Sequence, residues 1–308
     1  MRHYTFVDYA TQCYAAMVVA LILFFHNGTV PSWGLLLATN LAVLAVVHTL
    51  ILWHGRGTTS KTVDFFRHFY PVLLYTFFFC ETGLLNRMFF TDYLDPPLVR
   101  WEQAVFGCQP SVLFMNALPY LPISELFYAS YFSYYVMIAG VGIALFIRNR
   151  EQFFHYVSVI SFVFYICYTI YIFVPVIGPR VFFREIAGYN LPAEVQQLAV
   201  VDYYPHAIQS GPFYQVMAWI YRTFESPGAA MPSSHVAIAL CTVFFSFLYL
   251  RKIRYLHLVM AVLLCLSTIY CRYHYALDVV AGVLTAALLL PLGNSLYRTF
   301  DKSRSKIR

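Results

Sequence analysis

Residues 232–296 read PSSHVAIALCTVFFSFLYLRKIRYLHLVMAVLLCLSTIYCRYHYALDVVAGVLTAALLLPLGNSL. Three apolar runs lie in this stretch, at about 232–250, 256–273 and 276–296, and only short polar connections separate them. A bilayer core about 30 Å thick needs roughly 20 apolar residues per helix, so each run has close to the length of one crossing. The stretch therefore predicts three consecutive transmembrane helices.

Five further apolar runs precede this stretch and complete the predicted architecture. They lie at about 5–26, 33–53, 66–86, 124–147 and 153–175. The first run contains Asp8, and it lacks a clear small-residue cleavage site, so we expect it to be retained as a span rather than removed as a signal peptide. The sequence thus predicts an all-α, polytopic transmembrane helical bundle with about eight spans.

The composition supports a membrane protein of one domain. Of the 308 residues, 60% are hydrophobic and only 11% are charged, whereas a soluble domain carries about a quarter charged residues. A surface so poor in charge would aggregate in water. We therefore treat 1–308 as a single integral membrane domain: 1–65 hold N-terminal spans peripheral to the catalytic core, 66–296 form that helical core, and 297–308 form a basic cytoplasmic tail.

The distribution of basic residues predicts the orientation of the spans. The net charge is +6, and the basic residues cluster between apolar runs, which is typical of membrane topology rather than of nucleic-acid binding. If both termini are cytoplasmic, 14 of the 20 Lys and Arg residues lie on the inner side. These are Arg2, Arg56, Lys61, Arg67, Arg148, Arg150, Arg251, Lys252, Arg254, Arg298, Lys302, Arg304, Lys306 and Arg308.

Two long outer segments, at about 87–123 and 176–231, are rich in Pro, Gly and aromatic residues. Aromatic rings settle at the membrane–water interface, so we expect short interfacial helices in both segments. Loops of this length within a compact domain are usually functional or disordered, and the aromatic content argues against disorder.

Three polar segments fall at the outer ends of predicted spans. Gly178-Pro179-Arg180 follows the span at 153–175, Pro232-Ser233-Ser234-His235 opens the span at 232–250, and His274-Tyr275-Ala276-Leu277-Asp278 joins the last two spans. They are dozens of residues apart in the chain, yet the topology gives them one membrane depth. We expect them to form one site on the periplasmic or lumenal face.

The residue types in these segments suit phosphoester chemistry. His274 and Asp278 are four residues apart and would share a helix face, where a carboxylate can orient an imidazole. Arg180 and Arg272 would bind phosphate oxygens through their guanidinium groups. The alternatives are a structural His–Asp pair at a helix end and arginines that anchor the chain at the interface.

The segment around His235 has the pattern of a helix start. Proline is favoured in the first turn, and the free amides of that turn can bind an anion. Ser233 and Ser234 would add hydroxyl donors for phosphate, with His235 at the rim of the same pocket. A plain helix cap with an interfacial histidine is the alternative interpretation.

No motif predicts a cofactor or a metal. None of the seven cysteines forms a Cys-x-x-Cys pair, and most fall inside apolar runs, so we interpret them as small core residues. We see no cluster of residues with metal-ligand spacing.

The three segments, in this order, resemble the signature motifs of the type 2 phosphatidic acid phosphatase superfamily. The phosphatase branch has a lysine where Phe173 stands, a proline where Val181 stands, and an arginine near Ser267 and Thr268. These departures make the chain more similar to the inositol phosphorylceramide synthase and sphingomyelin synthase branch. The upstream stretch with Leu94-Asp95, Trp101-Glu102 and Phe106 to Ser111 resembles a segment of that branch, and the likeness covers roughly 75–295.

The resemblance implies a role for each residue of the site. His274 would attack phosphorus and form a phosphohistidine, with Asp278 orienting its ring. His235 would protonate the leaving alkoxide and then act as a base for the acceptor. Arg180, Ser233, Ser234 and the first-turn amides would hold the negative charge; whether Arg272 stands in for the missing motif arginine is left open.

The leading hypothesis is a membrane lipid phosphotransferase. It would move a phosphorylated head group from a phospholipid to a lipid alcohol, either ceramide or a diacylglycerol. The alternative is a lipid phosphate phosphatase that uses water as acceptor on phosphatidate-like lipids. A third hypothesis, a non-catalytic lipid transporter or scaffold, predicts polar residues along a path through the membrane, whereas here they gather at one face. The donor, the acceptor and the oligomeric state are not readable from the sequence.

Overall fold

The structure is a computed structural model that describes residues 3–57, 60–184, 189–198, 204–224 and 226–305. Eight long helices coincide with the eight predicted spans. They are α1 (Phe6–Phe25), α2 (Trp33–Gly55), α3 (Lys61–Leu85), α6 (Leu121–Arg148), α7 (Arg150–Phe173), α12 (Ser234–Tyr249), α13 (Arg254–Tyr270) and α14 (Ala276–Ser305). Within the described residues there is no strand, only an isolated bridge between Val176 and Ala229. The predicted all-α class is confirmed.

Several of these helices are able to cross a bilayer by length and composition. Helices α1, α2, α6, α7 and α14 each have the length and hydropathy of a span, while α12 and α13 are shorter apolar helices. Helix α3 is not among these candidate spans, and it carries four charged residues, Lys61, Asp64, Arg67 and Glu81. The chain is therefore a polytopic transmembrane helical bundle.

Two boundaries differ clearly from the predicted ones. Helix α3 begins at Lys61 instead of 66, because the Ser60 side chain accepts a hydrogen bond from Val63 N (3.5 Å) and caps the helix early. Helix α14 continues past 296 to Ser305, so most of the predicted basic tail extends this helix. No Gly or Pro stands between 297 and 305, so the sequence has no signal that would end the helix at 296.

Helix α7 lies at the centre of the bundle. It packs against α1, α3, α6, α12 and α14, and most of its length is buried. Helix α14 lies against α12 at Gly282, where an added Cβ would stand 2.6 Å from the carbonyl oxygen of Ser233. This close approach brings the starts of α12 and α14 together.

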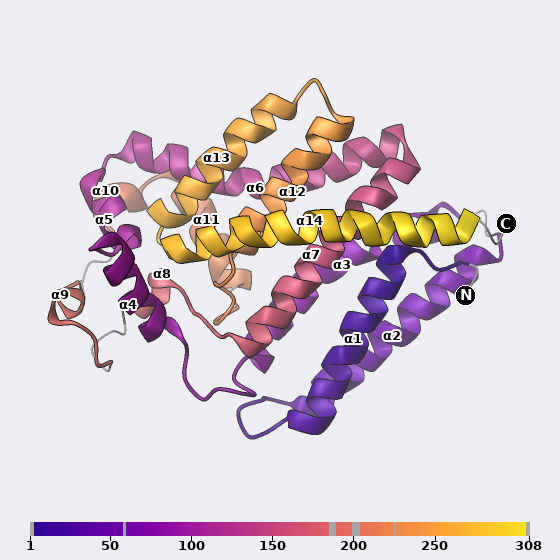
Figure 1. The fold of residues 1–308 in the computed structure, drawn as a ribbon, viewed down its shortest axis with the longest axis horizontal. Helices are drawn as coiled ribbons and strands as arrows, with labels where there is room; N and C mark the ends of the chain where they lie inside the picture. The colour runs from indigo at the N-terminus through magenta and orange to yellow at the C-terminus, as the bar shows by residue number, and fades with distance from the viewer. Residues whose placement is uncertain (1–2, 58–59, 185–188, 199–203, 225, 306–308) are drawn as a thin grey trace.

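The two long segments fold into short helices. The first holds α4 (Asp95–Phe106) and α5 (Pro110–Ala117), and the second holds α8 (Pro179–Phe182), α9 (Ala193–Gln196), α10 (His206–Gln209) and α11 (Pro212–Phe224). These helices gather at the end of the molecule opposite both termini (Figure 1). Helix α11 exposes Phe213, Val216, Trp219 and Phe224, as expected of a helix that lies at a membrane surface.

The N-terminal helices are tied to the bundle by a buried ion pair. Asp8 is completely buried in α1, where its carboxylate accepts hydrogen bonds from Arg67 Nη2 and Tyr70 OH of α3, each at 2.6 Å. The carboxylate also caps its own helix by accepting from Thr5 N (2.6 Å). These partners explain how α1 tolerates a charged residue.

We expect Asp8→Asn to lower the free energy of unfolding by about 3 kcal/mol, because Arg67 would stay buried without its counter-charge. Thermal unfolding of the detergent-solubilised protein measures the effect. A midpoint equal to that of the wild type would contradict this account of the N-terminal packing.

Candidate active site

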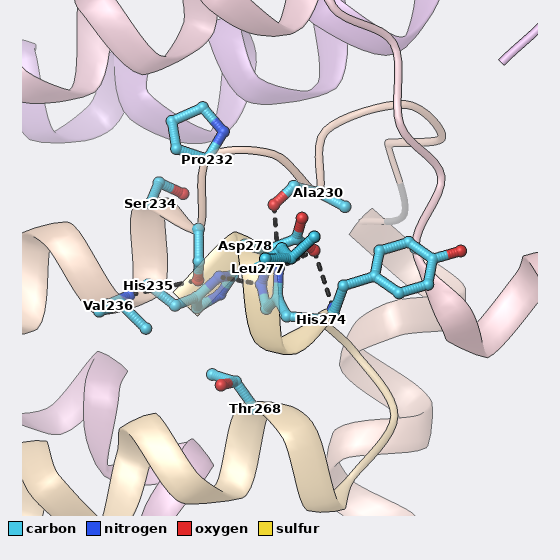
Figure 2. Close-up of polar contacts among 12 residues, drawn as sticks. Ala230, Pro232, Ser234, His235, Val236, Thr268, His274, Leu277 and Asp278 are labelled. Atoms are coloured by element: carbon cyan, nitrogen blue, oxygen red, sulfur yellow. Dashed lines mark hydrogen bonds and ion pairs between the residues drawn. The ribbon is translucent and has the colours of Figure 1, made fainter. Parts of the chain in front are cut away.

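Two histidines from separate helices face each other at the end of the bundle where the short helices gather. His235 lies in the first turn of α12, and His274 lies in the turn just before α14. His274 Nε2 is 3.4 Å from His235 Nδ1, and the two rings point toward one another (Figure 2). The structure therefore brings together the second and third of the predicted motif segments.

The hydrogen-bond partners of His274 indicate which of its ring nitrogens carries the proton. Its Nδ1 is 2.9 Å from the carbonyl oxygen of Ala230 and 3.4 Å from Asp278 Oδ2. A carbonyl oxygen can only accept, so Nδ1 carries the hydrogen and the neutral ring keeps its lone pair on Nε2. In the contact between the rings, His235 Nδ1 is then the donor. This arrangement leaves a nucleophilic nitrogen and a proton donor side by side.

Asp278 is held in place by the backbone around it. Its side chain is completely buried, and Oδ2 accepts a hydrogen bond from Tyr275 N (2.9 Å). Its backbone carbonyl accepts from Ser233 N (3.1 Å), which joins the start of α14 to the start of α12. The carboxylate can therefore orient His274 and stabilise positive charge on its ring.

The turn that carries His274 depends on Arg272. Arg272 has φ +62°, in the left-handed region, and Tyr273 N and His274 N both donate to the carbonyl of Thr268. The Arg272 guanidinium is buried and donates to Asn116 Oδ1 (2.7 Å) and Val112 O (3.2 Å) of α5. These contacts show a structural role, and the predicted phosphate role of Arg272 stays a prediction.

Arg180 lies in the same cavity as the two histidines. This cavity of about 50 Å³ is lined by Arg180, Tyr221, Tyr273, His235, His274, Phe79, Ile177, Phe224, Ser226, Pro227, Ala229 and Ala230. The guanidinium lies over the rings of Tyr221 (4.9 Å) and Tyr273 (6.0 Å), which stack on each other. Arg180 thus shares the cavity with His274 and rests on a stacked pair of aromatic rings.

Ser233 and Ser234 do not line this cavity. Ser233 Oγ accepts from Val236 N (3.4 Å) and caps α12. Ser234 N donates to the hydroxyl of Tyr171 (3.1 Å), which donates in turn to Pro232 O (2.9 Å). Two amides at the helix start are therefore already satisfied within the protein, and the predicted contacts of both serines with phosphate stay predictions. Tyr171 had no role in the sequence-based interpretation.

Glycine is required at the head of the Gly178-Pro179-Arg180 segment. Gly178 has φ +84°, and an added Cβ would stand 2.9 Å from the carbonyl oxygen of Tyr273 and 3.3 Å from the Cβ of Ala230. Only glycine adopts this conformation readily and allows so close an approach. The segment therefore packs directly against the His274 turn.

Two buried carboxylates of α4 contact the same segments. Asp95 accepts from Ile177 N, Gly178 N and Tyr275 OH, and Glu102 Oε1 accepts from Leu277 N (3.1 Å) in the first turn of α14. Burial raises the pKa of each carboxyl to about 7. The sequence placed both residues in a segment with a family likeness, but no spacing rule connected them to the site.

The arrangement is suited to phosphoryl transfer. It offers an imidazole lone pair, a neighbouring imidazole N–H, a guanidinium and an orienting carboxylate. Among the described residues, no group of three or more His, Cys, Asp or Glu side chains could hold a metal ion. A larger cavity of about 470 Å³ lies between α12 and the far half of α14, but it contains neither histidine of the site.

We expect Gly178→Ala to reduce turnover at least about tenfold, because the new Cβ would push Arg180 and the His274 turn apart. Gly107→Ala is the matched control: Gly107 also has a positive φ (+68°), but nothing lies within 4 Å of an added Cβ. The backbone of Gly178 (φ +84°, ψ 162°) lies in a region that is essentially restricted to glycine, whereas that of Gly107 (φ +68°, ψ 6°) is left-handed helical, so the Gly178 variant carries the larger backbone strain as well as the closer contacts. Steady-state kinetics compare them, and equal losses of turnover would contradict the role of close packing.

The raised pKa of Glu102 predicts a pH dependence of stability. Its folded-state pKa, about 7, exceeds its ordinary value of 4.5 because of burial. The stability contributed by this group is therefore fully present below about pH 4.5 and is lost as the pH rises to about 7. Glu102→Gln keeps an acceptor for Leu277 N and removes the titration. We expect the variant to gain up to about 3 kcal/mol relative to the wild type between pH 5 and pH 8. Thermal unfolding across this range measures the difference, and parallel curves for the two proteins would contradict it.

Comparison with known proteins agrees with this geometry. A model of the PAP2 superfamily matches residues 97–292, which is more than half of the chain and includes Arg180, His235, His274 and Asp278. No curated protein and no solved structure matches the chain significantly. Members of this superfamily are generally lipid phosphatases or phosphotransferases of related type. On the strength of the family match, the chain belongs to the PAP2 superfamily.

Proposed function

We propose that the chain is a membrane lipid phosphotransferase that moves a phosphorylated head group from a phospholipid to a lipid alcohol, ceramide or a diacylglycerol. One observation carries the proposal: His274 Nε2, with Nδ1–H held by Ala230 O and Asp278, faces His235 Nδ1 at 3.4 Å. A nucleophile and an acid that face each other across one site are what a double-displacement reaction at phosphorus requires.

In the first step, His274 Nε2 attacks the phosphorus of the donor phosphodiester. The bond between phosphorus and the glycerol oxygen breaks, and His235, entering the step as an imidazolium, gives one proton to the departing alkoxide and becomes neutral. The head-group phosphate is then bonded to His274, while Arg180 balances the negative charge on its oxygens. Asp278 stabilises the ring as it becomes positively charged.

In the second step, the acceptor hydroxyl attacks the same phosphorus. His235 takes the hydroxyl proton, the bond between nitrogen and phosphorus breaks, and His274 returns to its neutral form. Two features favour a lipid acceptor over water. The motif pattern is similar to the synthase branch, and the small cavity is lined largely by aromatic and other apolar groups that exclude solvent.

The substrate-bound site has to be wider than the one described. A separation of 3.4 Å between the two nitrogens leaves no room for a phosphate group between them. His235 is only partly buried, whereas His274 is 3% exposed. We therefore infer that the His235 side chain is the one that moves when the phosphate enters.

The proposed orientation follows the charge distribution. With both termini in the cytoplasm, the starts of α12 and α14 lie on the periplasmic or lumenal side, and the substrates reach the site from the outer leaflet.

Phosphatidate hydrolysis is the second candidate, because members of the PAP2 superfamily are generally phosphatase-type enzymes and the same residues would serve with water as acceptor.

Purified protein supplied with head-group-labelled phospholipid plus ceramide or diacylglycerol, and separately with labelled phosphatidate, distinguishes the two. We expect a new labelled phospholipid from the first mixture and little free phosphate from the second. Release of phosphate from phosphatidate alone would favour the phosphatase.

We expect His274→Ala to reduce product formation at least about a thousandfold. Losses of this size are usual when the nucleophile of a cooperating catalytic group is removed. His257→Ala serves as the control, because His257 is a partly buried histidine of α13 that bonds Ser246 away from the cavity. Mass spectrometry of the lipids gives the rates. A His274→Ala protein with full activity would contradict the nucleophile assignment.

A further inference from the structure

Helix α4 holds two buried carboxylates that the reaction steps above do not use. Asp95 opens the helix and Glu102 lies two turns further along, on the same face. Both are completely buried, and burial of an ionisable group needs compensating partners. Their partners all belong to the segments that carry the catalytic histidine and the cavity arginine.

The carboxylate of Asp95 joins two segments that are nearly a hundred residues apart. Its Oδ2 accepts from Ile177 N (2.9 Å), and its Oδ1 accepts from Gly178 N (2.9 Å) and from the hydroxyl of Tyr275 (2.8 Å). In its ionised form, which prevails above its pKa of about 7, this carboxylate has only acceptor sites and satisfies all three donors at once. Neither a hydroxyl nor an amide side chain could do the same.

Each of the three donors lies within three residues of Arg180 or His274 in the chain. Gly178 lies two residues before Arg180, and Tyr275 follows His274 in the chain. Asp95 therefore bonds to the backbone that carries the arginine and to the side chain adjoining the nucleophile. Glu102 adds a second hydrogen bond to the same segment, at Leu277 N, three residues after His274.

We propose that Asp95 is a positioning residue, which fixes the Gly178-Pro179-Arg180 segment against the His274 turn and thereby sets the distance from the arginine to the nucleophile. The inference rests on the proposed function, since it takes Arg180 as a ligand of the phosphate and His274 as the attacking group. The proposal also gives the first long outer segment a function. The membrane spans place the Gly178-Pro179-Arg180 segment and the His274 turn at the same depth, and α4 aligns the two with each other.

The hydrogen bonds of Asp95 act chiefly on the alignment of Arg180 with His274. A displacement of about 1 Å in a catalytic group can reduce a rate by about a hundredfold. In Asp95→Asn the side-chain NH₂ would face at least one of the three donors, whichever way the amide is turned. That donor would be left without an acceptor, and the segment that carries Arg180 would move away from the His274 turn.

The test compares three variants at a temperature well below their unfolding midpoints. Asp95→Asn removes the charge and one acceptor, and Tyr275→Phe removes one of the three hydrogen bonds. Asp8→Asn is the matched control, because Asp8 is an equally buried carboxylate whose hydrogen-bond partners among the described residues are Thr5, Arg67 and Tyr70, in the N-terminal part of the chain. Two measurements are made: amide hydrogen exchange in peptides covering 174–182, and kcat and KM for the lipid donor.

For Asp95→Asn we expect faster exchange in 174–182 and a kcat lowered at least about thirtyfold, with KM changed less than about threefold. Tyr275→Phe should show the same pattern with a loss of about three- to tenfold in kcat. Asp8→Asn should leave both measurements at their wild-type values while lowering the unfolding midpoint.

Wild-type exchange and wild-type kcat in Asp95→Asn would overturn the proposal. If that variant does not fold, Tyr275→Phe decides the question, and wild-type behaviour there would overturn it equally. If the wild-type protein converts no phospholipid or phosphatidate, the proposed function fails, and the exchange measurement alone then shows whether Asp95 holds the segment.

Discussion

The hydrogen bond from His274 Nδ1 to the carbonyl of Ala230, supported by the Asp278 carboxylate, is the interaction on which the site depends. It fixes the proton on one ring nitrogen and leaves the other as a base directed at His235. Both residues are almost completely buried, and burial of an imidazole and a carboxylate is costly without such partners. The fold around the site can be understood as the means of keeping these partners in place.

Each partner belongs to a different part of the chain. Ala230 precedes α12 and is tied by its amide to the carbonyl of Val176, next to the segment that carries Arg180. Asp278 lies in the first turn of α14 and accepts Ser233 N on its backbone carbonyl. The starts of α12 and α14 are thus joined directly, and the close packing at Gly282 allows it. His235 and His274 meet at one end of the bundle because α12 and α14 begin next to each other.

The sequence predicted the eight helices well because apolar runs of spanning length leave few alternatives in a bilayer. The pairing of His274 with Asp278 was also predictable, because a spacing of four residues implied that the two side chains would be neighbours. The partners that lie far apart in the chain were not predictable. Asp95 and Glu102 stood out only as members of an upstream stretch with a family likeness, and only the folded chain reveals which backbone amides they bind. The same holds for Arg272, whose side chain turns toward α5.

The central claim is that His274 becomes covalently phosphorylated during turnover. Mixing the protein with head-group-labelled phospholipid in the absence of acceptor, and then mapping the label by peptide mass spectrometry under alkaline conditions, tests this claim most directly. We expect the label on the peptide that contains His274, and its loss when a lipid alcohol is added. Turnover with no labelled protein, or with the label on another residue, would contradict the account.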